Sequence, residues 1–195
     1  MRIKPRDKSS DRKENLVLEV RRVHELGPIP DPVCSKNCPD YNPSIGCHRD
    51  CQAAPNQLSS EGFNSPVESL VAPLVFELKK LGAFYPCWSC EGHNDQSGSL
   101  WKIPRVWFYA DSVVHIRALA DAVDSLFRAR LLSTRWEIVL TYSDSDNPDT
   151  TFSLEPESAG KCENLCDLQN DLRVLAEGLE KHFWRACDQL EANAR

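Results

Sequence analysis

The chain has 195 residues, a net charge of −6 and 41% hydrophobic residues, a composition typical of one globular domain with extensions. No apolar run approaches the roughly 20 residues that a membrane-spanning helix needs, and the charged first 15 residues lack the apolar core of a secretory signal. The sequence therefore predicts a cytoplasmic protein whose nine cysteines stay reduced. Its acidity argues against a dedicated nucleic-acid-binding protein, although the basic N-terminal tail leaves a phosphate contact open.

Residues 1–64 are predicted to precede the main domain. The charged stretch 1–14 predicts a disordered tail, and residues 15–26 carry Leu16, Val20 and Val23 at helical spacing. A run rich in proline ends this helix. Residues 15–64 are thus predicted to form an N-terminal extension that consists of the helix and a cysteine-rich, metal-binding segment.

Residues 65–195 are predicted to form the main domain, with the element order α-β-β-α-β-β-α. A capping box formed by Ser65 and Glu68 opens the first helix, and Pro73 is expected to kink it or to separate its first turn. Strands are expected over 83–90, 101–110, 135–143 and 150–154. Asp111 or Ser112 is expected to cap the second helix, whose apolar stripe runs from Ile116 to Phe127, and the last helix is expected over about 161–192.

The short turns within each strand pair predict a mainly antiparallel sheet with helices on one face, which is an α+β two-layer sandwich. The last predicted helix has leucines at steps of three and four along its whole length. This stripe predicts core packing or, alternatively, a surface that docks a protein partner.

Four cysteines fall within one short segment of low apolar content: Cys34, Cys38, Cys47 and Cys51. Such a segment buries too little surface to fold alone, so a metal would offset its ordering entropy. Four thiolates suit structural zinc or an iron–sulfur cluster. Disulfides and free thiols are the alternatives.

A second group, Cys87, Cys90 and His93, falls where a strand is expected to end in a turn. Two thiols and an imidazole can hold zinc, with a fourth position left for water, substrate or a protein ligand. Glu91 beside this position is a candidate general base or acid. Without metal, Cys90 and His93 could instead form a thiolate–imidazolium nucleophile, and a purely structural role is the third alternative.

A third cysteine pair, Cys162 and Cys166, lies one helical turn apart, and its two thiols are candidate metal ligands for either group. Cys187 lies about 31 Å beyond Cys166 along a straight helix, so it cannot share a metal site with that pair. It is expected to be a buried apolar residue.

Strand residues supply the candidate substrate-binding groups. Arg105, Trp107 and Tyr109 alternate along the second strand and are expected to share one face. Glu155 is expected to approach the His93 turn if the two strand pairs lie side by side, and to be an exposed strand end otherwise.

Ser89-Cys90-Glu91-Gly92-His93 after a strand, Ala110-Asp111 opening a helix, and the strand 136–142 together resemble the wybutosine-synthesising tRNA methyltransferase family. That family has a Ser-Cys-x-Gly turn in a similar strand–helix–strand setting. The resemblance covers under a third of the chain and implies S-adenosylmethionine binding near Ser89 and Cys90.

The sequence thus favours a cytoplasmic metal-binding protein with a structural four-cysteine site and a second site at Cys87, Cys90 and His93. One alternative is an enzyme, a methyltransferase-like protein or a metal-assisted hydrolase, that acts through the turn from Cys90 to His93. The other is an interaction module without enzymatic activity.

Overall fold

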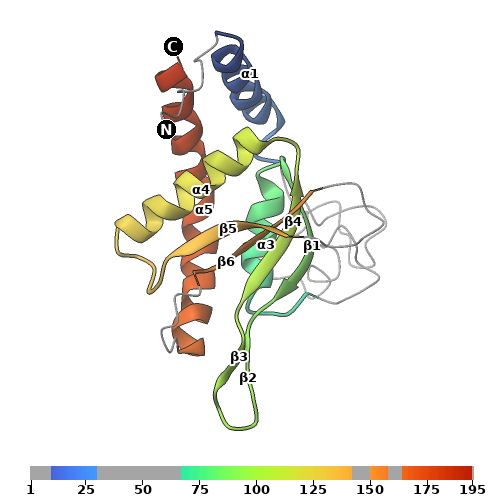
Figure 1. Cartoon of the computed structure of the whole chain (residues 1–195), viewed down its shortest axis with the longest axis vertical. Coiled ribbons are helices and arrows are strands. Elements are labelled where there is room, and N and C mark those ends of the chain that lie inside the picture. Colours follow the sequence, from blue (N-terminus) through green and yellow to red (C-terminus); the bar gives the residue numbers. More distant parts are fainter. Residues whose placement is uncertain (1–9, 30–66, 142–149, 158–163, 195) are drawn as a thin grey trace, which may run out of the picture.

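The computed structural model describes residues 10–29, 67–141, 150–157 and 164–194 (Figure 1). The helices are α1 (Ser10–Leu26), α3 (Ala72–Lys80), α4 (Val113–Arg128) and α5 (Leu165–Ala194). The strands are β1 (Phe84–Cys90), β2 (His93–Asn94), β3 (Leu100–Lys102), β4 (Arg105–Ala110), β5 (Trp136–Thr141) and β6 (Thr151–Pro156). Among these residues, none of the helices has the length and apolar character that crossing a membrane requires.

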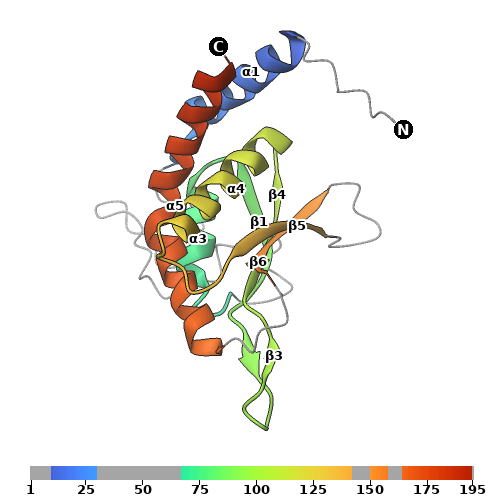
Figure 2. The same ribbon diagram turned by 60° about the vertical axis from the view of Figure 1, so that its left-hand side comes forward.

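Four of the strands form one antiparallel sheet in the order β1-β4-β6-β5. The other two, β2 and β3, form a hairpin that extends away from the sheet beyond the end of β1 (Figure 1). Helices α3, α4 and α5 lie together on one face of the sheet (Figure 2). The expected α+β architecture with a mainly antiparallel sheet is confirmed.

The core lies between this helical layer and the sheet. Val106 and Phe108 of β4 are completely buried, as the alternation of the strand requires. Phe84 of β1 packs edge-to-face against Phe108 and against Phe183 of α5, with ring centroids 5.6 Å apart in both pairs. The apolar stripe of α5 is therefore part of the core, and Phe183 of this stripe contacts the sheet through Phe84.

Pro73 separates the first turn from the first core helix, as expected, whereas one strand boundary differs from the expectation. The first core helix begins at Ala72, with Pro73 in its first turn, and residues 67–71 are not helical. Because proline has no backbone N–H to donate, it fits the start of a helix and not its interior. The second strand is divided into β3 and β4, since Ile103 and Pro104 interrupt the ladder.

Helix α1 begins at Ser10 instead of Asn15, so residues 10–14 of the expected tail are helical. Val20 and Val23 are buried in the same core as the helical layer. His24 stacks on Trp184 of α5, and Arg21 donates to Glu191 of the same helix at 3.2 Å. This helix is therefore part of the packed domain.

A fully buried carboxylate joins α5 to the start of β5. Asp171 accepts hydrogen bonds from the Ser133 amide and hydroxyl at 2.8 and 2.9 Å, from the Thr134 amide at 3.3 Å and from Trp136 Nε1 at 3.0 Å. One side chain thereby satisfies four donors in the connection between α4 and β5.

Replacing Asp171 by Ala should lower the free energy of unfolding by about 3 kcal/mol or more, because these buried donors would lose their acceptor. Urea denaturation measures the change. Arg173→Ala is the control on the same helix, since its exposed ion pair with Glu177 should contribute under ~0.5 kcal/mol. Equal midpoints for the two variants would contradict a structural role for Asp171.

Candidate metal site

Three potential metal ligands lie together at the end of β1: Glu68, Cys90 and His93. Their ligand atoms are all within 4.8 Å of one another. His93 Nε2 lies 3.0 Å from Glu68 Oε1, while the Cys90 side chain closes the group from the buried side. The set offers one thiol, one imidazole and one carboxylate, which can hold a metal ion.

Glu68 is held in place by the backbone amide of the residue that follows β1. Its Oε2 accepts from the Glu91 amide at 2.7 Å, and in return Glu91 Oε2 accepts from the Leu70 amide at 2.9 Å. These two hydrogen bonds fasten residues 68–70 to the end of β1. Because Glu68 keeps Oε1 for His93, one carboxylate both fastens the segment and faces the site.

The sequence did not indicate Glu68 as a site residue. Its place three residues after Ser65 suggested a capping box, which would have directed the side chain to the start of a helix. Pro73 was the contrary signal, because it separates residues 67–71 from α3 and leaves Glu68 on a non-helical segment.

Glu91, expected as a general acid or base, is turned toward Leu70 by the hydrogen bond to that amide. It is not in the group of close ligand atoms. The Glu91 carbonyl accepts from Gln169 Nε2 of α5 at 3.2 Å. Glu91 therefore positions the turn between the sheet and the helices.

Gly92 lets the chain turn between Cys90 and His93. Its φ of +83° lies in the left-handed region, which side-chain-bearing residues rarely adopt. A Cβ atom here would lie 2.7 Å from Leu165 Cδ1 and 2.9 Å from Pro104 Cδ. Backbone conformation and close packing both require glycine at this position.

The protonation of Cys90 distinguishes the chemical alternatives. Burial raises the pKa of the Cys90 thiol, and the nearby Glu68 carboxylate raises it further. A hydrogen bond from the Gly92 backbone and the charges of Lys102 and Arg105 act in the opposite direction. An activated thiolate nucleophile has a lowered pKa, so the raised pKa of Cys90 argues against the nucleophile alternative.

The other predicted cysteine ligands do not join Glu68, Cys90 and His93 among the described residues. Cys87 is buried, and Cys166 is exposed at the start of α5; neither belongs to the group of close ligand atoms. Strand β1 runs through both Cys87 and Cys90, and three residues of extended chain span about 10 Å. Cys34, Cys38, Cys47, Cys51 and Cys162 lie outside the described residues.

The predicted substrate-binding residues share one face of β4, as expected, but they are spread along it. Arg105 is the cross-strand neighbour of Cys90, and its Nη1 lies 3.6 Å from Glu155 Oε2 of the adjacent β6. The two strand pairs therefore do lie side by side, and Glu155 reaches Arg105. Trp107 packs against Trp88 with ring centroids 4.9 Å apart.

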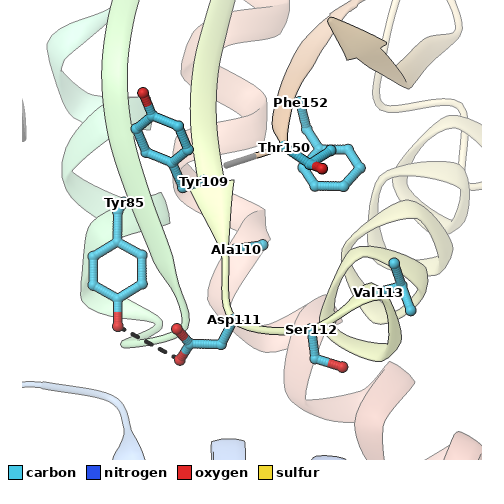
Figure 3. Close-up of a pocket in the computed structure, with 8 residues that line it drawn as sticks. All are labelled: Tyr85, Tyr109, Ala110, Asp111, Ser112, Val113, Thr150 and Phe152. Atoms are coloured by element: carbon cyan, nitrogen blue, oxygen red, sulfur yellow. Dashed lines mark hydrogen bonds between the residues drawn. The ribbon is translucent and has the colours of Figure 1, made fainter. Parts of the chain in front are cut away.

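Tyr109 belongs to a separate pocket of about 500 Å³ at the opposite end of β4 (Figure 3). Tyr85 Oη lies 3.5 Å from Asp111 Oδ2 at one side of this pocket, and Ser112 and Val113 of the α4 start line another side. Arg105 and Tyr109 consequently do not form one substrate site.

No protein-family model, curated protein or solved structure matches this chain. The chemistry of the site is therefore inferred from its ligand set and surroundings.

Gly92 and Gly98 make a matched pair of variants, since both have a φ of +83° but a Cβ at Gly98 would meet nothing within 4 Å. Gly98→Ala should cost ~1–2 kcal/mol from backbone strain. Gly92→Ala should cost a further ~1–3 kcal/mol, because Leu165 and Pro104 must move. Thermal and urea unfolding compare the two. Equal losses would mean that the packing around Gly92 has no structural weight.

Proposed function

We propose that the protein binds one zinc ion through Glu68 Oε1, Cys90 Sγ and a His93 ring nitrogen. The observation that carries the proposal is the closeness of these three ligand atoms, each within 4.8 Å of the others. Tetrahedral zinc with ligand bonds of about 2.0–2.3 Å needs ligand atoms roughly 3–4 Å apart, so only small side-chain movements are required. The ion would replace the direct contact between His93 and Glu68.

The ligand set favours zinc over the other metals considered. Thiolate and imidazole suit a borderline-soft ion, whereas magnesium and calcium prefer oxygen ligands alone. An iron–sulfur cluster is held mainly by thiolates, and this group contains a single cysteine.

Three protein ligands leave one tetrahedral position open, which is the arrangement of catalytic zinc sites. The exposure of the ligands supports an open position on the solvent side: the side chains of Glu68 and His93 are 34% and 38% exposed. Cys90 closes the inner side, with only 4% of its surface exposed. We infer that water or a substrate group completes the coordination, and that the site supports metal-assisted chemistry.

The proposal predicts that His93→Ala, Cys90→Ser or Glu68→Gln each removes one equivalent of zinc from the protein. Loss of a ligand should weaken binding by more than the roughly 100-fold that changes in outer-shell residues cause. Elemental analysis of dialysed, anaerobically purified protein measures the stoichiometry, and cobalt(II) substitution gives a thiolate charge-transfer band that Cys90→Ser should remove.

Cys166→Ser is the matched control, because this exposed thiol lies outside the group and should leave the metal content unchanged. Since cysteines 34, 38, 47 and 51 could bind metal independently, the difference between wild type and variant is compared, not the total. The same comparison in a protein with those four cysteines changed to serine isolates the site. A zinc content that His93→Ala leaves unaltered in both backgrounds would refute the proposal.

A further inference from the structure

Both strand-borne ligands of the proposed zinc site have a cation directly across the β-ladder. Cys90 is the register partner of Arg105 in the β1–β4 pair, and His93 is the register partner of Lys102 in the β2–β3 hairpin. Residues directly opposite each other in an antiparallel pair share one face, with Cβ atoms about 4.5–5.5 Å apart. Each cation therefore lies beside the ligand it faces.

The two cations differ in how far they are neutralised. Arg105 is paired with Glu155, which also accepts a hydrogen bond from the Ser153 hydroxyl. Lys102 is exposed, and no carboxylate among the described residues pairs with it; its ammonium lies 4.3 Å from the centre of the Trp101 ring. Glu91 accepts from the Leu70 amide, which orients its carboxylate toward that segment but does not neutralise its charge. Lys102 therefore contributes a positive charge beside His93 that is in no ion pair with a described carboxylate.

A zinc ion bound by the Cys90 thiolate and the Glu68 carboxylate would carry no net charge, because the two anionic ligands balance the dication. The charge presented to the open coordination position would then come from the residues around it, and Lys102 contributes a positive charge there. Its long, exposed side chain starts from the strand that faces His93. A group that approaches the ion from the side of this strand would pass the ammonium.

We propose that the open metal position takes the oxyanion of a ligand, a carboxylate or phosphate group, and that Lys102 is the positioning residue that attracts and holds it. This inference rests on the proposed zinc site. An ammonium acts as a mobile point charge and does not need the two-point geometry of a guanidinium, so Lys102 can serve either oxyanion. Because the ammonium also repels the metal ion, Lys102 should weaken metal binding while it strengthens anion binding.

The test uses the full chain loaded with cobalt(II), whose visible spectrum reports changes in coordination. Wild type, Lys102→Ala, Lys102→Glu and Lys102→Arg are titrated with acetate and with methylphosphonate, and with neutral imidazole as an uncharged ligand. Lys181→Ala, an exposed lysine on α5, is the matched control. Spectra are taken as differences from His93→Ala, so that metal bound elsewhere in the chain does not contribute.

Lys102→Ala should weaken anion binding by about three- to tenfold, Lys102→Glu should weaken it more, and Lys102→Arg should restore it. Imidazole binding should change less than about twofold, and cobalt should bind the alanine variant at least as tightly as wild type. Added salt should reduce the difference between wild type and Lys102→Ala. The anion whose binding affinity falls more when Lys102 is replaced is the preferred oxyanion.

Two results overturn the inference while the zinc site stands: cobalt binds normally but neither anion changes its spectrum, or anion affinity is the same with and without Lys102. An equal loss of imidazole and anion binding would also overturn it, because a change in the site itself, not charge, would then be the cause. Absence of any cobalt signal that depends on His93 would remove both the metal site and the anion site.

Discussion

Two reciprocal hydrogen bonds between residues 68–70 and Glu91 determine whether this candidate site exists at all. They bring the Glu68 carboxylate, from the segment before α3, to the end of β1, where Cys90 and His93 follow in the sequence. Without them the site would keep one thiol and one imidazole. The contact also links the helical layer to the sheet, since Gln169 of α5 donates to the Glu91 carbonyl.

The sequence predicted the individual helices and strands better than the tertiary contacts between them. Alternation and helical stripes located every strand of the sheet and the long α5, because burial on one side imposes these periods. Of the two expected caps of α4, Asp111 and Ser112, it is Ser112 whose hydroxyl accepts from the Val114 amide. Cys187 was expected to be buried because its distance from Cys166 excludes a shared metal site; it is fully buried, and burial raises the pKa of its thiol to about 12.

The site was predicted only in part, because its third ligand comes from a position 22 residues before Cys90 in the sequence. Local spacing indicated Cys90 and His93, which flank the Gly92 turn, but it also suggested Cys87, which an extended strand carries away from them. Glu68 joins them through tertiary contacts that no short motif encodes. The four-cysteine site at Cys34 to Cys51 and the S-adenosylmethionine site that the family resemblance implies stay predictions.

The hydrogen bond between Glu68 and the Glu91 amide also affects the edge of the sheet. Among the strands that the structure describes, β1 pairs with β4 alone, so it is an edge strand of the described sheet. Three features oppose pairing of this edge with another extended chain: Pro86 has no amide hydrogen, the ladder bulges between Pro86 and Trp88, and Glu68 occupies the Glu91 amide. The outer edge of β1 is therefore a poor template for strand addition, and Glu68, which helps to assemble the site, contributes to this protection.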